Sequence, residues 1–587
     1  MHCRLALLLA SLLLVAGLLP GTEVRAWQAA GLRESNVAVP MRDGRFLSAH
    51  ILRPGTGARV PALVYRTPYG KDAALADYGI FQKAVARGYA VVVQDVRGRY
   101  ASEGEFRAYE NEGRDGYDTI EWAARQPWSD GAVGTFGLSY PGAVQWLAAV
   151  ENPPHLKAMV PAMTFSSAQN FWFAGGTWDM SWIDWIWLNI APDVRARKHL
   201  DGPRTAEEAA ANWSAEGARM KDHLPLAQMP QLRDVAPFYY DWLGHPAPDP
   251  WWNWADLRDK YARNHAAVLN LSGWYDDNYG PEGAITNYLG LRRSRPRAPA
   301  DTALLLGPWV HGVSSTATPK SGERSFPGNA AIDYDEIVLA WMDHYLRGID
   351  NGVDRAKPVR YYVMGTNEWR ESTAWPPPAR PTVFYLSPGD QRLGVLSPVK
   401  PRTALREASF VSDPDDPVRN AYEASGAHDY RQLATRADVL TFDTPPLARD
   451  TEVTGPIRAQ LYVSCDCRDF DLWVRLLDKD PDGTVYNLMS PGLDVQRVSY
   501  RDIHHGRQWL EPGKVYAIEL PNLLTSNTFL KGHQIRVQVM ASFHPNFSRN
   551  LQSGENEVLS RASRKATIHL YADRQRPSNI VLPVAGH

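Results

Sequence analysis

The sequence has 587 residues, 44% of them hydrophobic, and a net charge of −2 from 63 Lys and Arg against 65 Asp and Glu. This length exceeds what one hydrophobic core supports, so we expect about two to four domains. The ordinary composition excludes a disordered chain, and the balanced charge gives no reason to expect nucleic acid or an anionic membrane as a partner.

The N-terminal segment has the pattern of a secretory signal peptide. Arg4 precedes an apolar run over 5–19, and Val24-Arg25-Ala26 fits a cleavage site. A membrane anchor is the alternative reading, but the run is shorter than the roughly 20 residues that a span needs. We therefore predict that residues 1–26 are removed and that the mature protein, with no membrane span, is exported to the periplasm or the extracellular space.

Apolar strands alternate with helices through the first part of the mature chain. Two edge strands are expected over 27–60, and helices over 110–126 and 335–348. Strands that are buried on both faces read as continuous apolar runs, so the pattern predicts a parallel sheet covered by helices on both sides. The predicted buried strands are VPALVYRT and the segments 88–100, 132–138, 266–277 and 302–312.

Two further regions depart from this pattern. Residues 166–255 are rich in Trp, Ala and charged residues, and the helical spacing of Trp178, Trp182 and Trp185 predicts a helical insertion over the sheet. After residue 375, short strands separated by turns predict a β-sandwich or jelly roll. The expected domains are an α/β domain over 27–165 and 256–374, a helical cap over 166–255 and a jelly roll over 375–587.

The segment Gly137-Leu138-Ser139-Tyr140-Pro141-Gly142 lies between a predicted buried strand and a predicted helix. A Gly-x-Ser turn in this position is the nucleophile elbow of the α/β-hydrolases, which exposes the serine hydroxyl above the sheet. Such a hydroxyl needs a general base that is oriented by a carboxylate, and in this fold the chain order is Ser, acid, His. Asp276 and His311 each follow a later predicted strand, in that order; Asp277 is the rival acid.

The chain resembles the family of cocaine esterase and Xaa-Pro dipeptidyl-peptidase-like serine hydrolases, which includes α-amino-acid ester hydrolases and glutaryl acylases. The resemblance runs through NVAVPMRDG, YRTPYGK, QDVRGRYASEGEF, GLSYPG, GWYDD, GPWVHG and MGTNEWR. It implies an α/β-hydrolase core, a helical cap and a C-terminal jelly roll, with Ser139 as nucleophile, Asp276 as acid and His311 as base. It also implies that the Tyr69 hydroxyl and the backbone N–H of Tyr140 stabilise the oxyanion.

The expected function is hydrolysis of ester or amide bonds of small acyl substrates through an acyl-enzyme, without a metal or other cofactor. Family members that bind an α-amino group carry a carboxylate where this chain has Pro141, and Asp184, Asp249 or Asp277 would have to replace it. A Xaa-Pro dipeptidyl-peptidase or α-amino-acid ester hydrolase is therefore the alternative activity, a ligand-binding protein is the alternative of another class, and a homo-oligomer stays open. The expected pocket is aromatic, formed by Trp172, Trp178, Trp182, Trp185, Trp274 and Trp309.

Two remaining motifs are expected to carry no chemistry. Cys465 and Cys467 would close a very small ring, so we predict free thiols. The run from Asp478 to Gly483 resembles the start of a calcium loop, but Met489 stands where the bidentate Glu should be, so a hairpin turn is expected.

Overall fold

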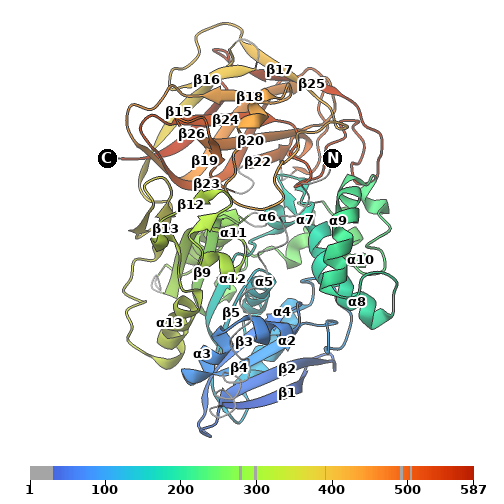
Figure 1. The fold of residues 1–587 in the computed structure, drawn as a ribbon, viewed down its shortest axis with the longest axis vertical. Coiled ribbons are helices and arrows are strands. Elements are labelled where there is room, and N and C mark those ends of the chain that lie inside the picture. Colours follow the sequence, from blue (N-terminus) through green and yellow to red (C-terminus); the bar gives the residue numbers. More distant parts are fainter. Residues whose placement is uncertain are drawn as a thin grey trace, which may run out of the picture.

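The computed structural model describes residues 31–586 apart from 247, 277–279, 297–300, 390–391, 490–492 and 503–504. The predicted signal peptide, residues 1–26, and Asp277 lie outside the described residues. In Figure 1 a β-sandwich stands above an α/β part, and a group of helices lies beside the junction between them. The predicted fold class, an α/β core with a helical cap and a C-terminal β-sandwich, is confirmed.

The α/β part is built on a ten-stranded sheet. Its strands are, in spatial order, β1 (Gly31–Pro40), β2 (Phe46–Pro54), β4 (Ala90–Asp95), β3 (Val60–Thr67), β5 (Ser129–Leu138), β6 (Leu156–Ala162), β9 (Ala267–Tyr275), β10 (Thr302–Val310), β13 (Val359–Val363) and β14 (Glu368–Ser372). The pairs from β4 across to β13 are parallel, and the pairs at both edges are antiparallel. The carboxyl ends of the parallel strands therefore meet along one edge of the sheet, where ligands bind in open α/β folds.

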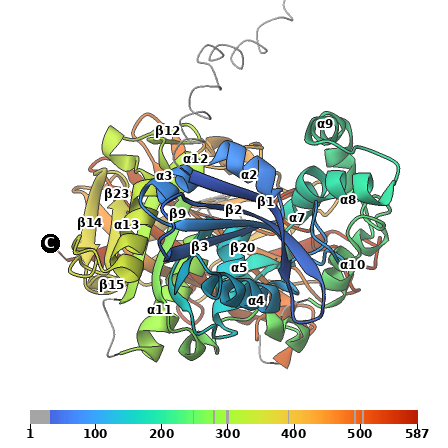
Figure 2. The same ribbon diagram turned by 90° about the horizontal axis from the view of Figure 1, so that it is seen from below.

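Helices bury both faces of this sheet, which explains the continuous apolar runs of its strands. Phe81 and Trp341, from the helices α3 (Ile80–Ala86) and α13 (Tyr334–Arg347), share a core cluster with Phe136 of β5. Val144 shares another cluster with Val64 of β3, and it belongs to α5 (Tyr140–Ala149), which packs beside α4 (Glu112–Ala124). Figure 2 shows α3 on one side of β3 and α4 and α5 on the other. The remaining helices of this part are α2 (Lys71–Asp77), α11 (Gly280–Ser294) and α12 (Val313–Thr316).

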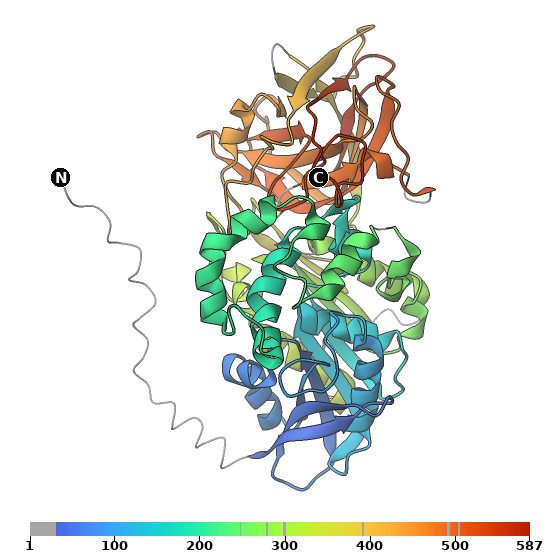
Figure 3. The ribbon, with the colours of Figure 1, turned by 90° about the vertical axis from the view of Figure 1, so that its right-hand side faces the viewer.

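The helical cap lies between β6 and β9 in the chain, and Figure 3 shows its helices facing the viewer. Its elements are α6 (Ala168–Phe171), β7 (Phe173–Ala174), β8 (Thr177–Trp178), α7 (Ser181–Trp185), the π-helical turn η1 (Ile186–Ile190), α8 (Ala191–Lys198), α9 (Ala206–Asp222), η2 (Leu226–Gln228), α10 (Pro237–Gly244), η3 (Pro250–Trp254) and η4 (Tyr261–Arg263). No helix in the described part of the chain combines the length and apolarity that crossing a bilayer requires.

One prediction for the cap is wrong. Trp182 and Trp185 lie on α7, as their spacing predicts, but Trp178 lies in the strand β8. Gly175 and Gly176 have φ values of 53° and 85°, which glycine adopts at little cost, and they close a hairpin between β7 and β8. This hairpin breaks the helical repeat before α7 begins.

The C-terminal part is a sandwich of mostly antiparallel strands around its own core. Only the pair of β16 (Leu393–Ser397) and β18 (Leu440–Asp443) is parallel among the pairs described for this sheet. Its other strands are β15 (Ala379–Ser387), β17 (Glu407–Ser412), β19 (Thr451–Cys465), β20 (Asp471–Lys479), β21 (Val485–Asn487), β22 (Leu493–Arg497), β23 (Tyr516–Phe529), β24 (Gln534–Met540), β25 (Ala566–Tyr571) and β26 (Asn579–Ala585). Short elements outside the three parts' main layers are β11 (Lys320–Ser321), β12 (Arg324–Ser325), η6 (Gly328–Ala330), η7 (Arg431–Thr435) and η8 (Val498–Tyr500).

The cap and the sandwich are joined by backbone hydrogen bonds. The carbonyl of Gly175 accepts from the N–H of Arg497 at 2.8 Å, and a Cβ at Gly175 would overlap the carbonyl oxygen of Val495. Close by, the N–H of Ser548 donates to the carbonyl of Trp178 at 2.8 Å. The β7–β8 hairpin is thus held against β22 of the sandwich.

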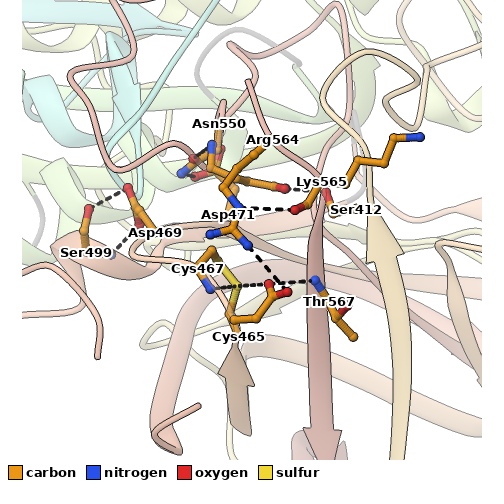
Figure 4. Close-up of a disulfide and its surroundings, with 12 residues drawn as sticks. Ser412, Cys465, Cys467, Asp469, Asp471, Ser499, Asn550, Arg564, Lys565 and Thr567 are labelled. Carbon is orange, nitrogen blue, oxygen red and sulfur yellow. Dashed lines mark hydrogen bonds and ion pairs between the residues drawn. A yellow bond between two sulfur atoms is a disulfide. The ribbon is translucent and has the colours of Figure 1, made fainter. Parts of the chain in front are cut away.

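The prediction of free thiols is wrong, because Cys465 and Cys467 form a disulfide (Figure 4). The chain bends at Asp466, whose carboxylate accepts from the N–H of Thr567 at 3.0 Å. This bend brings the two Cα atoms to 5.1 Å, within the usual range for a disulfide, so the short ring closes. The predicted hairpin turn near Gly483 is confirmed by the antiparallel pairing of β20 and β21.

Candidate active site

The turn between β5 and α5 carries Ser139 in a strained conformation. Its φ is 69° and its ψ is −128°, a region that costs a residue other than glycine about 1–3 kcal/mol. The neighbouring glycines are required by close contacts: a Cβ at Gly137 would lie 2.5 Å from the Cβ of Pro141, and one at Gly142 would lie 2.6 Å from the carbonyl oxygen of Ala162. Strain that the surrounding packing maintains in this way is typical of a functional position.

Asp276 and His311 meet at the carboxyl ends of β9 and β10. Asp276 is fully buried, and its Oδ1 lies 2.9 Å from Nδ1 of His311. Its Oδ2 accepts a hydrogen bond from the Ser272 hydroxyl at 3.2 Å, so both carboxylate oxygens have a partner. A buried carboxylate bonded to Nδ1 fixes the imidazole as the Nδ1–H tautomer and stabilises its charged form.

A cavity of about 530 Å³ brings Ser139, His311 and Tyr69 together. The Tyr69 hydroxyl accepts a hydrogen bond from Nε1 of Trp185 at 3.0 Å and interacts with the side chain of Ser139. Burial raises the pKa of Tyr69 to about 12, so the phenol keeps its proton at neutral pH and can donate it in a hydrogen bond. The arrangement offers a hydroxyl, an imidazole and a neutral donor around one space.

Tyr140 is the first residue of α5, where a backbone N–H has no partner within its own helix. Its side chain points into a buried network that the sequence did not indicate. The hydroxyl donates to Oε1 of Glu112 at 2.7 Å and accepts from the N–H of Tyr109 at 2.9 Å. Oε2 of Glu112 in turn lies 2.9 Å from Nη1 of Arg66. Burial raises the pKa of both Glu112 and Tyr140, and the network anchors the residue next to Ser139.

The rest of the cavity wall is mainly apolar and aromatic, with three carboxylates. Asp179 is 8% exposed and accepts from the N–H of Ser181 at 2.8 Å, whereas Asp184 is paired with Lys221 at 2.6 Å. The apolar and aromatic side chains of the wall belong to Tyr65, Tyr78, Ile80, Phe136, Leu138, Pro141, Phe171, Trp182, Trp185, Leu188, Val313 and Tyr334, and the third carboxylate is Asp335.

Among the six tryptophans predicted for the pocket, only Trp182 and Trp185 belong to the described lining of this cavity. The other four are buried in the core and are corrections to the prediction. Trp172 stacks on Trp182 with ring centroids 5.6 Å apart, and Trp178 packs against Phe173 at 5.0 Å. The indole N–H groups of Trp274 and Trp309 donate to the carbonyls of Tyr362 and Ala330, at 2.9 and 2.8 Å, and neither ring belongs to the described lining of the cavity.

The three carboxylates predicted as candidates for recognising an α-amino group differ in their position relative to the cavity. Asp184 lines the cavity. Asp249 instead caps η3, where it accepts from the N–H of Trp251 at 2.8 Å, and Asp277 lies outside the described residues. Asp179 and Asp335 were missed, because neither lies near the Ser, Asp or His motif in the chain.

Among the described residues, one cluster outside this site combines two carboxylates and a histidine in the way that a metal ion could require. Asp478, Asp480 and His533 lie within 4.8 Å of one another in the sandwich. Nδ1 of His533 is 2.9 Å from Asp478 and 3.2 Å from Asp480, so the imidazole itself occupies the position between the carboxylates. This geometry is that of a structural ion pair.

Comparisons with known proteins agree with this architecture. Residues 43–313 match the model of the X-Pro dipeptidyl-peptidase (S15) family, and residues 351–581 match that of the X-Pro dipeptidyl-peptidase C-terminal non-catalytic domain. The chain is 33% identical to the cocaine esterase of Rhodococcus sp. (strain MB1 Bresler) over 580 residues, which cover 94% of this chain and 98% of the relative.

Two solved structures share the whole fold. An α-amino acid ester hydrolase superposes with a TM-score of 0.77 at 24% identity, covering 94% of this chain and 97% of the other. An aminopeptidase from a marine sediment archaeon, Thaumarchaeota archaeon, superposes with a TM-score of 0.80 at 24% identity, covering 95% and 97%. At this identity the two structures support the fold alone.

Proposed function

Because the chain belongs to the family of X-Pro dipeptidyl-peptidases (S15) and cocaine esterase, and is a serine hydrolase, we propose that it cleaves esters or amides of small apolar acyl groups. We assign Ser139 as the nucleophile, His311 as the general base and Asp276 as the residue that orients it. The observation that carries this assignment is the 2.9 Å contact between Asp276 and His311 at the cavity that Ser139 also lines.

In the proposed mechanism Oγ of Ser139 attacks the substrate carbonyl carbon, and its proton passes to Nε2 of His311. The carbonyl oxygen becomes an oxyanion, which accepts hydrogen bonds from the Tyr69 hydroxyl and the N–H of Tyr140. The bond to the leaving group then breaks, and the alcohol or amine departs with the proton from His311. Water repeats the sequence on the acyl-enzyme, releasing the acid and restoring Ser139.

The cavity wall supports an apolar or aromatic acyl group as the preferred substrate part. Trp182, Phe171 and Leu188 line the same cavity as Ser139, and burial of such apolar surface contributes about 25 cal/mol per Å² to binding. The expected substrates are therefore small esters with bulky apolar acyl groups.

A substrate with an α-amino group is the second candidate, because three carboxylates, Asp179, Asp184 and Asp335, line the same cavity. A carboxylate within about 4 Å of an ammonium group stabilises it where water is partly excluded. An α-amino-acid ester or an Xaa-Pro amide would use this charge, and the exchange D179N would then raise KM for the amino ester while leaving the KM of an uncharged ester unchanged.

A substrate panel tests the proposal directly. Aryl acyl esters, α-amino esters, glutaryl amides and Xaa-Pro amides are assayed with the unchanged protein and with S139A, and Ser139 labelling by a fluorophosphonate is measured in parallel. We expect the apolar esters to be hydrolysed fastest, and S139A to lose both hydrolysis and labelling. Absence of both turnover and labelling in the unchanged protein would favour a ligand-binding role.

We also propose that the protein is exported. The N-terminal sequence pattern supports this, and so does the disulfide Cys465–Cys467, because disulfides persist mainly in oxidising compartments. Expression of the full chain in a bacterial host, followed by N-terminal sequencing of the periplasmic and secreted fractions, should find a mature protein that begins at Trp27. Recovery of uncleaved protein in the cytoplasm alone would contradict the proposal.

A further inference from the structure

Trp185 belongs to the cap, yet its side chain reaches a residue of the α/β part. Its indole Nε1 donates a hydrogen bond to the Tyr69 hydroxyl oxygen at 3.0 Å. A phenol that accepts a hydrogen bond still has its own proton to donate, and accepting polarises the O–H group so that it becomes a stronger donor. The indole therefore directs the Tyr69 proton away from itself and strengthens it as a donor.

The same ring contacts the residue that supplies the second proposed donor. The rings of Trp185 and Tyr140 are stacked, with centroids 6.1 Å apart and an angle of 12° between their planes. Tyr69 meets Tyr140 edge-on at 6.4 Å. The hydroxyl of Tyr140 is held by Glu112, and the ring of the same side chain packs against Trp185, so both contacts hold the first residue of α5.

A buried arginine ties the two backbones that carry this contact. Arg99 is fully buried, and its Nε donates to the carbonyl of Pro68, next to Tyr69, at 2.8 Å. Its Nη1 and Nη2 donate to the carbonyls of Ile190 and Asn189, at 2.8 and 2.9 Å, in the π-helical turn that directly follows Trp185. π-Helical turns are rare and occur frequently at functional sites. The distance from Trp185 to Tyr69 is thus set by interior hydrogen bonds.

From these contacts we propose that Trp185 is a positioning residue, through which the cap orients the Tyr69 hydroxyl toward the developing oxyanion. The inference rests on the proposed function, since it concerns the same reaction. If Trp185 acts in this way, α7 contributes to the rate of the proposed hydrolysis as well as to the wall of the substrate cavity. Loss of the indole N–H is expected to lower kcat, because the oxyanion carries its full charge only as the reaction proceeds.

The test removes the N–H while keeping an aromatic ring. W185F, and a second variant with 3-benzothienylalanine at position 185 that preserves the shape of the indole, are assayed on an uncharged aryl ester. One hydrogen bond contributes about 1 kcal/mol, so we expect kcat to fall about five- to tenfold and KM to change less than about twofold. Thermal melting of each variant establishes that the fold is retained, and the isosteric variant decides the question if W185F does not fold.

A double-mutant comparison separates positioning from general packing. If Trp185 acts through Tyr69, Y69F and the double variant Y69F/W185F should have the same kcat within about twofold. Trp182 provides the matched control, because it lies on the same helix and cavity but its Nε1 donates to the carbonyl of Phe171 at 3.3 Å. The effects of W182F and Y69F are therefore expected to multiply.

The inference is overturned if the kcat of the isosteric variant stays within twofold of that of the unchanged protein. It is also overturned if the losses of kcat from W185F and Y69F multiply in the double variant, as those of W182F and Y69F are expected to do. The proposed function fails in a different way, by S139A retaining hydrolysis. A protein in which S139A is inactive and the position-185 variants are unaffected would keep the proposed function and lose only this inference.

Discussion

Replacing Tyr140 with Phe should destabilise the α/β part, because the Tyr140 hydroxyl satisfies two buried groups. It donates to the carboxylate of Glu112 at 2.7 Å and accepts from the N–H of Tyr109 at 2.9 Å. A hydrogen bond to a charged group contributes about 1.5–3 kcal/mol, and a buried N–H left unpaired costs about 1–3 kcal/mol. With partial relaxation around the site, we expect Y140F to lower the free energy of unfolding by roughly 3 kcal/mol.

Urea unfolding, followed by tryptophan fluorescence and by loss of ester hydrolysis, measures this change in the transition that inactivates the protein. The matched control is Y288F, because Tyr288 is also buried, at 1% exposed, and its hydroxyl has no hydrogen-bond partner among the described residues. Its removal takes away a buried hydroxyl without a partner, so the free energy of unfolding should stay the same or rise. Equal midpoints for Y140F and Y288F would refute the reasoning, since the buried bond to Glu112 would then contribute nothing.

Three other results are expected. G142A should destabilise the protein by at least about 2 kcal/mol in urea unfolding, because the new Cβ would lie 2.6 Å from the carbonyl oxygen of Ala162. The control G244A, with open space around the new Cβ, should be close to neutral. Similar losses of stability in both variants would contradict the packing argument. D276N should lower kcat about 10⁴-fold at neutral pH because the His311 tautomer and its charge are no longer supported, and a loss below about tenfold in steady-state assays would count against the assigned acid. The raised pKa of Tyr69, about 12, predicts that its donor proton is kept throughout pH 7–10, so a fall in kcat near pH 10 that Y69F abolishes would disprove this.

The position of the candidate site was predictable because strand order and turn chemistry are local properties. Gly137 and Gly142 flank Ser139 in the chain, and the structure explains both by contacts within the same turn and with β6. Asp276 and His311 follow consecutive parallel strands of the sheet, and the carboxyl ends of such strands necessarily meet. This topology is enough to predict that the two side chains lie near each other, and Oδ1 of Asp276 is 2.9 Å from Nδ1 of His311.

The cavity wall was predictable only in part, because burial depends on contacts between distant segments. Trp182 and Trp274 are both aromatic residues near motifs, but one lines the cavity and the other donates to the carbonyl of Tyr362, 88 positions away. The Glu112 network was missed for the same reason, since nothing in the chain links Glu112 with Tyr140 before α4 packs against α5. The disulfide was missed because a bend at a single residue decides whether the ring can close.

The hairpin at Gly175 limits how far the cap can move when a substrate enters the cavity. A cap joined by main-chain hydrogen bonds to a separate folded part is held from above as well as from the α/β core, so it acts as a stationary wall. We therefore expect entry and product release to rely on side-chain rearrangements at the rim, which are fast compared with movement of a whole domain. The sandwich, which provides no proposed reacting group, would in this way fix the dimensions of the chamber in which the reaction takes place.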